Sequence, residues 1–286
     1  MISVFQGIVL GLLQGAFELF PVSSLGHSVI FPQLVGWNIH ENDNSFLIFL
    51  VATHLATALV LIGFYWATWV KVVAGMVRSL RQRQIGSQDS DAKLGWLLVV
   101  GTIPAGILGL LFQDSIRTIF VTARSAAFFL MLNGVILLAA EALRRRAKQS
   151  EAGTDMPARI ARLSWWQGAR VGIVQALALI PGFSRSGSSM GGGLLAGLSN
   201  EDAANFSFLL ATPIILAAGA LKVPELFQHQ NASLVLPCFV GAIAAAISAY
   251  LAVRYLTRYF KTNSLKPFGI YCLVGGLVYS LLLWPR

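Results

Sequence analysis

Charged residues are scarce in this sequence. They account for 12% of its 286 residues, against roughly 25% in a typical soluble domain. Hydrophobic residues account for 56%, the mean hydropathy is +0.70, and several apolar runs approach the ~20 residues that span a bilayer. These values exclude an ordinary soluble domain and predict an integral membrane protein. The net charge of +9 is gathered in a few short loops, which indicates membrane orientation and argues against a nucleic-acid partner.

Cysteine is also scarce. The two cysteines, Cys238 and Cys272, both lie inside apolar runs, where a thiol behaves as a small hydrophobic group. The sequence therefore predicts neither a disulfide framework nor a cysteine-based metal site. No lysine or arginine precedes Lys71, so we expect no signal peptide, which would need a positively charged start.

Two apolar stretches, 11–27 and 172–189, share one design. Each has G-x-x-Q, an apolar run, a proline and then a serine-rich turn. On hydropathy alone, residues 1–36, which contain the first stretch, are one poor transmembrane helix. The proline and serine interruption indicates instead two half-helices joined by a turn, which survives at membrane depth only inside protein or beside water. The matched pairs are Gly11 with Gly172, Gln14 with Gln175, Pro21 with Pro181, and Ser24 with the neighbourhood of Ser184.

The rest of the chain predicts an all-α polytopic membrane protein of one domain, 1–286. FLVAT at 49–53 and FLLAT at 208–212 extend the repeat, so each half consists of one re-entrant hairpin and three spans. An odd number of spans per half gives inverted-topology repeats, approximately 1–145 and 164–286, joined by a polar cytoplasmic linker, 146–163. The six predicted transmembrane helices are 46–66, 94–112, 126–143, 206–221, 234–253 and 268–284.

Basic loops set the expected orientation. The loops 71–93, 144–170 and 254–266 are rich in lysine and arginine and should be cytoplasmic. The loops 37–45, 113–124 and 222–233 and both termini should then lie outside. The assignment alternates without conflict only if each broken stretch enters and leaves on the same side.

Two ionisable residues stand in the first broken stretch. An ionised side chain at the bilayer centre costs about 2.5–3.5 kcal/mol on insertion scales, so Glu18 is a candidate functional residue. It can hold a divalent cation or act as a base, and His27 can pass a proton. The alternative is an interfacial glutamate near a loop.

Arg185 is the single charged residue between Arg170 and Glu201, and it stands in a Gly/Ser-rich turn. Its planar fork suits a phosphate, and backbone amides of such a turn can form an anion nest. The alternative is a flexible loop with an interfacial arginine. Together the two turns suit phosphoryl transfer or hydrolysis on a lipid-borne phosphate.

Two other polar residues lie in the predicted spans. We interpret His54 as a helix-contact residue, and we expect Glu141 to pair with Arg145 at a membrane edge.

At these residues the sequence resembles the undecaprenyl-diphosphatase family, the bacitracin-resistance proteins, over nearly its whole length. The motifs are GAFELFPVSSLGH at 15–27 and PGFSRSG at 181–187. The resemblance implies hydrolysis of undecaprenyl diphosphate to the monophosphate, which recycles the lipid carrier for cell-wall synthesis and confers bacitracin resistance. It also implies a bacterial plasma-membrane enzyme with a divalent cation and a site facing the periplasm or exterior.

The family's site residues carry over onto this chain. Ser24 is our first choice of nucleophile, His27 the general acid/base, and Glu18 the ligand of Mg²⁺ or Ca²⁺; attack by water or by His27 stays open. The predicted diphosphate-binding residues are Arg185, Ser184, Ser186, Ser189, Ser23 and Gln14. Family members commonly carry an acidic residue where this chain has Gln14, which bears on metal ligation.

Two other functions remain open at this stage. A polyprenyl-phosphate transporter or flippase would use the same inverted repeats and the same Arg185 and Glu18 without cleaving the lipid. A degenerate lipid-binding relative is suggested by Gln14 alone. The expected partners are a polyprenyl diphosphate and the lipid bilayer, and a homodimer stays open.

Overall fold

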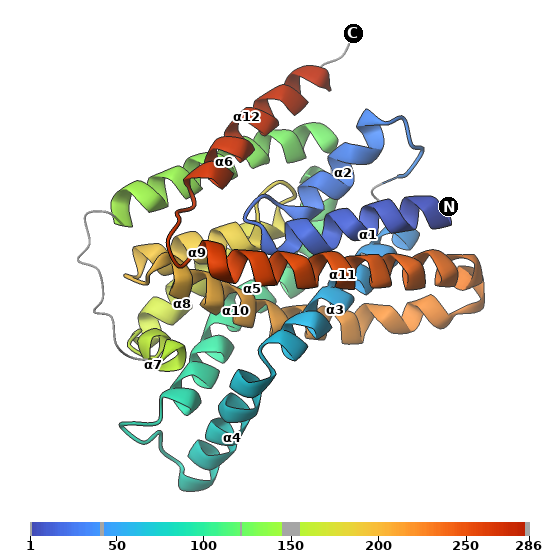
Figure 1. Ribbon diagram of the computed structural model, residues 1–286. Coiled ribbons are helices and arrows are strands. Elements are labelled where there is room, and N and C mark those ends of the chain that lie inside the picture. Colours follow the sequence, from blue (N-terminus) through green and yellow to red (C-terminus); the bar gives the residue numbers. More distant parts are fainter. Residues whose placement is uncertain (1, 41–42, 121, 145–154, 284–286) are drawn as a thin grey trace.

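The computed structural model describes residues 2–40, 43–120, 122–144 and 155–283, without the side chains of 113–120 (Figure 1). Every regular element in these ranges is helical, as predicted. The elements are α1 (Val4–Leu19), α2 (Ser24–Leu34), α3 (Asn44–Phe64), α4 (Trp66–Gln82), α5 (Ser90–Phe120), α6 (Ala123–Arg144), α7 (Met156–Ile160), α8 (Trp165–Gln175), η1 (Ala176–Leu179), α9 (Arg185–Leu195), α10 (Asn200–Lys222), η2 (Val223–Phe227), η3 (His229–Leu234), α11 (Val235–Tyr259) and α12 (Lys266–Leu282).

Both broken stretches are two helices joined by a turn, so the single-helix alternative for residues 1–36 is wrong. The first helix of each pair begins with a capping box, Ser3 with Gln6 in α1 and Ser164 with Gln167 in α8. The second helix of each pair begins after a capping serine, which accepts a hydrogen bond from a backbone N–H in the first turn. These serines are Ser23 before α2 and Ser184 before α9. Structurally, Ser23 therefore corresponds to Ser184 and Ser24 to Arg185, a shift of one residue from the sequence match.

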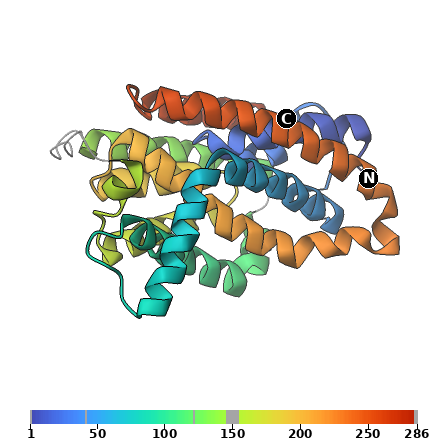
Figure 2. The same cartoon turned by 60° about the horizontal axis from the view of Figure 1, so that its bottom comes forward.

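Glycines allow the first helix of each pair to pack closely on a long helix. In Figures 1 and 2, α1 lies along α11. A Cβ atom on Gly11 would overlap the carbonyl oxygen of Gly241 in α11, so no side chain fits there. In the other half α8 packs on α5, and Gly172 meets the backbone of Gly101 in the same way. Small residues of this kind let membrane helices approach backbone to backbone.

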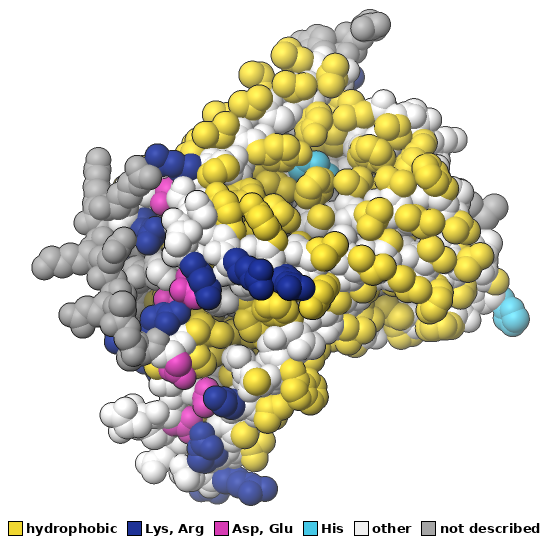
Figure 3. Space-filling view, in the orientation of Figure 1, with side chains coloured by type: hydrophobic (Ala, Val, Ile, Leu, Met, Phe, Trp, Pro, Cys, Tyr) yellow, Lys and Arg dark blue, Asp and Glu magenta, His cyan; other side chains and the backbone are white. Residues whose placement is uncertain are grey.

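Apolar side chains cover most of the face in Figure 3, and charged side chains gather along its left and lower left edge. Five stretches are long and apolar enough to cross a membrane: 44–64, 90–112, 123–144, 200–227 and 229–259. The predicted sixth span falls on α12, which is apolar but shorter. The predicted all-helical polytopic membrane protein is thus confirmed, with five of the six predicted spans long enough to cross a membrane.

Several predicted loops are helical. The 71–93 segment continues as α4 to Gln82, and the predicted outer loop 113–124 is helical as far as Phe120. Of the linker 146–163, residues 146–154 lie outside the described residues, and 156–160 form α7. Polar side chains on a surface helix leave its backbone hydrogen bonds intact, so polarity alone does not break a helix. Arg159 anchors α7, because its Nε lies 2.9 Å from the Asp202 carboxylate oxygens.

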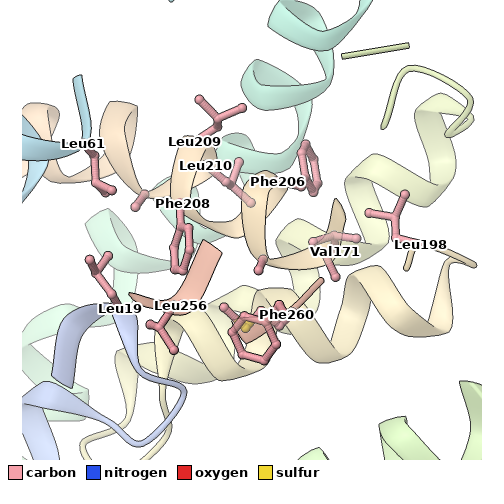
Figure 4. Packing of buried hydrophobic residues seen from close by; sticks show 14 of the residues in the cluster. Leu19, Leu61, Val171, Leu198, Phe206, Phe208, Leu209, Leu210, Leu256 and Phe260 are labelled. Carbon is pink, nitrogen blue, oxygen red and sulfur yellow. The ribbon is translucent and has the colours of Figure 1, made fainter. Parts of the chain in front are cut away.

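The helix α10 runs through the main hydrophobic core (Figure 4). Phe206, Phe208, Leu209 and Leu210 are fully buried within it. They pack in one cluster with Leu19, the last residue of α1. Leu19 directly follows Glu18 in the chain, so the end of α1 that carries Glu18 is held by a closely packed core.

Candidate active site

Glu18 is the centre of a buried polar cluster. It stands in the last turn of α1, and its carboxylate is 5% exposed. The Ser24 hydroxyl donates to Oε2 at 2.6 Å, and Arg185 Nη2 donates to Oε1 at 2.6 Å. Side chains from both predicted turns therefore bond to one carboxylate. The juxtaposition of Glu18, Ser24 and Arg185 expected from the repeat is present in the structure.

Ser24 and Arg185 are the first residues of α2 and α9. The N-terminus of a helix carries a partial positive charge and free backbone N–H groups, both of which favour an anion. The turn before α2 is strained, since Ser23 has φ 68° and ψ 95°, a region that non-glycine residues rarely adopt. Such strain is concentrated at functional sites. The site thus combines two helix starts with a constrained serine turn.

Asn133 of α6 ties the two turns together. Its Nδ2 donates to the carbonyl oxygen of Pro21 at 3.1 Å, and its Oδ1 accepts from the backbone N–H of Ser184 at 3.1 Å. Ser186 Oγ also links the two turns, because it donates to the carbonyl oxygen of Phe20 at 3.1 Å. Asn133 was not among the predicted site residues. Its signal was an amide in the middle of an otherwise apolar span.

A cavity of ≈ 170 Å³ opens at this cluster. Its apolar wall comes from α2, α5, η1, α10 and the turn before α9. Its polar lining residues are Glu18, Ser23, Ser24, His54, Gln175 and Arg185. A cavity with one apolar wall and a cluster of polar groups suits a ligand with an apolar chain and a charged end.

His54 belongs to this site, although we interpreted it from the sequence as a helix-contact residue. Its Nε2 lies 3.1 Å from Glu18 Oε2, and its Nδ1 lies 2.6 Å from the carbonyl oxygen of Leu50. A carbonyl and an ionised carboxylate can only accept hydrogen bonds, so both ring nitrogens donate, as in the charged imidazolium. Glu18 is therefore flanked by two cationic groups. A histidine in the middle of an apolar span was the available signal.

His27 occupies a different environment. Its Nδ1 lies 2.7 Å from the carbonyl oxygen of Ser23, and its Nε2 lies 2.8 Å from the Tyr271 hydroxyl of α12. Its ring packs against Phe17, with centroids 4.5 Å apart and the rings tilted by 51°, and His27 is not among the residues that line the cavity. The structure therefore places His27 outside the cavity lining, in contact with the backbone of the serine turn.

The predicted binding residues divide into two groups. Ser23 and Arg185 line the cavity, whereas the remaining serines and Gln14 do not. Ser184 Oγ accepts from the backbone N–H of Gly187 at 3.0 Å, and Ser189 Oγ lies 2.6 Å from Ser207 Oγ. Gln14 Nε2 donates to Glu18 Oε2 at 3.1 Å. These side chains build the turns and orient Glu18. Glu141 lies 3.6 Å from Arg144, and its expected partner Arg145 lies outside the described residues.

The donor atoms that could hold a divalent cation are few. Among the described residues, no group of three or more His, Cys, Asp or Glu side chains is placed to share a metal ion. Glu18 is the one carboxylate in the cluster, and the buried Oε1 of Gln14 has no hydrogen-bond partner. A carboxylate and an amide oxygen are hard ligands that suit Mg²⁺ or Ca²⁺. The set fits a cation that takes most of its ligands from phosphate and water.

Comparisons with known proteins agree over almost the whole chain. The family model described as bacitracin resistance protein BacA matches residues 7–278. A protein of Mycolicibacterium paratuberculosis named undecaprenyl-diphosphatase is 48% identical, covering 96% of this chain and 95% of its own length. One of Frankia alni named undecaprenyl-diphosphatase 2 is 41% identical and covers 96% of each chain. This chain belongs to the bacitracin resistance protein BacA family.

Proposed function

We propose that this chain is a membrane phosphatase that hydrolyses undecaprenyl diphosphate to the monophosphate and inorganic phosphate. The observation that carries this function is the shared carboxylate: Ser24 and Arg185 both bond to Glu18 beside a partly apolar cavity. A hydroxyl nucleophile, a base and a phosphate-binding arginine are thereby in one place. The names of the relatives support the same reaction, and the product would return to cell-wall synthesis as lipid carrier.

In the reaction we propose, Ser24 attacks the terminal phosphorus. The hydroxyl already donates to Glu18 Oε2 at 2.6 Å, so Glu18 accepts the proton as the Oγ–P bond forms. The bond from phosphorus to the bridging oxygen breaks, and undecaprenyl monophosphate leaves with the electron pair. Water then attacks the phosphoserine: its oxygen bonds to phosphorus as the Oγ–P bond breaks, one of its protons passes to Ser24 Oγ, and inorganic phosphate leaves with the other. Glu18 gives up the proton it took from Ser24 to the departing monophosphate and is a free base again.

Arg185 holds the diphosphate in this proposal. In the structure its Nη2 bonds to Glu18 Oε1 at 2.6 Å and its Nη1 donates to the carbonyl oxygen of Ser207 at 3.0 Å. The bond to Ser207 fixes the plane of the guanidinium, which leaves its other edge for phosphate oxygens. The two helix starts at Ser24 and Arg185 add favourable partial charge for the same anion.

The acid/base role expected of His27 stays a prediction. His54 is the histidine that lines the cavity and contacts Glu18, so the geometry favours His54 as the imidazole near substrate. For His27 we propose a positioning role, because its ring bonds to the carbonyl oxygen of the strained Ser23 and to Tyr271. The imidazole then holds the turn that presents Ser24.

The test of function is phosphate release from purified protein in detergent. Undecaprenyl diphosphate is the substrate, and a mock preparation from cells without the protein is the blank. Hydrolysis needs no membrane sidedness, whereas a transporter or flippase needs two sides. A protein that releases no phosphate in detergent but moves polyprenyl phosphate across proteoliposomes would establish the transporter instead.

Within the membrane we propose six spans and two re-entrant hairpins in an inverted repeat, with the cavity facing the periplasm or exterior. The support is the charged edge in Figure 3 and the break of each hairpin at its serine turn. Arg83→Cys should resist an impermeant maleimide in intact cells, whereas Asn38→Cys should react; both positions are exposed. Both native cysteines are buried, so background labelling should be low. Labelling at position 83 from outside would refute this orientation.

The cation expected at Glu18 is also a proposal. Glu18 would hold it, and its chemistry would be to neutralise phosphate charge. Gln14→Glu places a second carboxylate where Nε2 now donates to Glu18 at 3.1 Å, and a cation relieves the resulting repulsion. We expect the Mg²⁺ or Ca²⁺ midpoint for phosphate release to fall about tenfold, since charged oxygen ligands set cation affinity.

The matched control is Gln6→Glu, two turns earlier in the same helix. Gln6 is at the N3 position of the capping box, where glutamate caps equally well, so the metal midpoint should stay unchanged. An unchanged midpoint in Gln14→Glu would place position 14 outside the metal shell. A parent inactive at every metal concentration, rescued by Gln14→Glu, would indicate a degenerate relative.

A further inference from the structure

Gln175 is a buried amide without a partner inside the cavity. The residue is 1% exposed, and neither Nε2 nor Oε1 has a hydrogen-bond partner. It is the last residue of α8, and it lines the cavity together with Glu18 and Arg185. Buried polar side chains are nearly always hydrogen-bonded, so an amide with both ends unpaired calls for a ligand.

The repeat shows what Gln175 lacks. Its counterpart Gln14 donates to Glu18, four residues further along α1 and on the same side of the helix. Four residues after Gln175 stands Leu179, which offers no acceptor. The second hairpin therefore has the amide but no carboxylate at the position that satisfies Gln14 in the first. A molecule bound in the cavity can supply the acceptor that the described residues do not.

We propose that Gln175 is a substrate-binding residue whose Nε2–H donates to an oxygen of the polyprenyl diphosphate, an inference that rests on the proposed function. Phosphate oxygens are strong acceptors, and a hydrogen bond to a charged acceptor is stronger than one between neutral groups. The amide adds this bond without adding a positive charge beside Arg185 and His54. Its place on the cavity wall, between α8 and η1, gives the second hairpin a phosphate contact in addition to Arg185.

The test compares three side chains of similar length at position 175. Methionine removes the hydrogen bond at nearly constant volume, and glutamate replaces the donor with a charge that repels phosphate. With farnesyl diphosphate as the probe in detergent, we expect Gln175→Met to lower kcat/KM for phosphate release by about 10- to 100-fold, the range for a hydrogen bond to a charged group. Gln175→Glu should lower it further.

Stability separates binding from a structural role. Because the amide is unpaired in the free protein, Gln175→Met should leave the thermal midpoint of the ligand-free protein unchanged or higher. Inorganic diphosphate should raise the midpoint of the parent more than that of Gln175→Met. The matched control is Ser188→Ala, which removes another buried polar group without a partner, outside the cavity lining. It should keep the kcat/KM of the parent.

Two results would overturn the inference. One is an unchanged kcat/KM in Gln175→Met. The other is a loss of activity in Gln175→Met together with a lower thermal midpoint of the ligand-free protein, which would show that the substitution destabilises the fold. If the parent releases no phosphate, the proposed function fails, and the diphosphate-induced rise in midpoint still decides the role of Gln175. Equal shifts in the parent and in Gln175→Met, or no shift in either, would then contradict the inference.

Discussion

Ser24→Ala is expected to lower the rate of phosphate release by about a thousandfold or more, because removing the nucleophile of a covalent mechanism leaves only binding and electrostatic stabilisation. The Ser24 hydroxyl is 2.6 Å from Glu18 Oε2 and lines the cavity. Binding should survive, since Arg185 stands on the other hairpin. The measurement is single-turnover phosphate release, with substrate affinity followed by the shift in thermal midpoint.

The matched control is the neighbouring hydroxyl. Ser23 Oγ accepts from the backbone N–H of Gly26 at 3.1 Å, so Ser23→Ala should cost about 1 kcal/mol of stability as a lost helix cap, with a milder loss of activity. Substrate labelled in its terminal phosphate should leave acid-stable label on the parent and none on Ser24→Ala. Parental activity in Ser24→Ala would assign the attack to water or to His27.

Arg185→Lys is expected to lower kcat/KM by about 10²- to 10³-fold, the usual effect of removing one aligned donor from a charged transition state. The guanidinium reaches the Ser207 carbonyl through Nη1 and Glu18 through Nη2 at the same time. A lysine ammonium is a single point charge and cannot hold the backbone contact while presenting a planar edge to phosphate. Arg185→Ala should be at least as severe.

The same substitution at an exposed arginine provides the control. Arg78 forms two hydrogen bonds to Asp89 in the α4–α5 region, at 2.7 and 2.8 Å, far along the chain from both turns. Arg78→Lys should keep normal turnover, since exposed ion pairs contribute little. Both variants should elute and melt like the parent. Near-normal kcat/KM in Arg185→Lys would limit Arg185 to its ion pair with Glu18 and contradict a role in holding phosphate.

Much of the site could be predicted from residues alone because its chemistry is costly in a membrane. Glu18 and Arg185 are charges in apolar surroundings, and the repeated glycine, glutamine, proline and serine pattern placed them in equivalent turns. A charge that persists there needs a partner, and the structure shows that each is the other's partner, at 2.6 Å. The prediction rested on the energetic cost of placing a charged side chain in the membrane, and a charge inside an apolar run can be seen in the sequence.

The fates of the hydroxyls and histidines could not be predicted in this way. Ser184, Ser186 and Ser189 have the same chemistry as Ser24, yet they bond to backbone groups or to other serines. Whether a serine caps a helix or faces a cavity depends on which backbone groups lie within about 3 Å, and that depends on packing. The same holds for the choice between His27 and His54.

The sequence by itself determined the membrane class, the helical fold and the two broken hairpins, because hydropathy, helix-breaking residues and capping serines act locally along the chain. Tertiary structure alone decided which side chains meet. It brought His54 of α3 to Glu18, placed Asn133 between the two turns, turned His27 toward Tyr271 and left Gln175 unpaired in the cavity. These relations depend on the rotation and depth of each helix against its neighbours, which are set by close packing at positions such as Gly11 and Gly172.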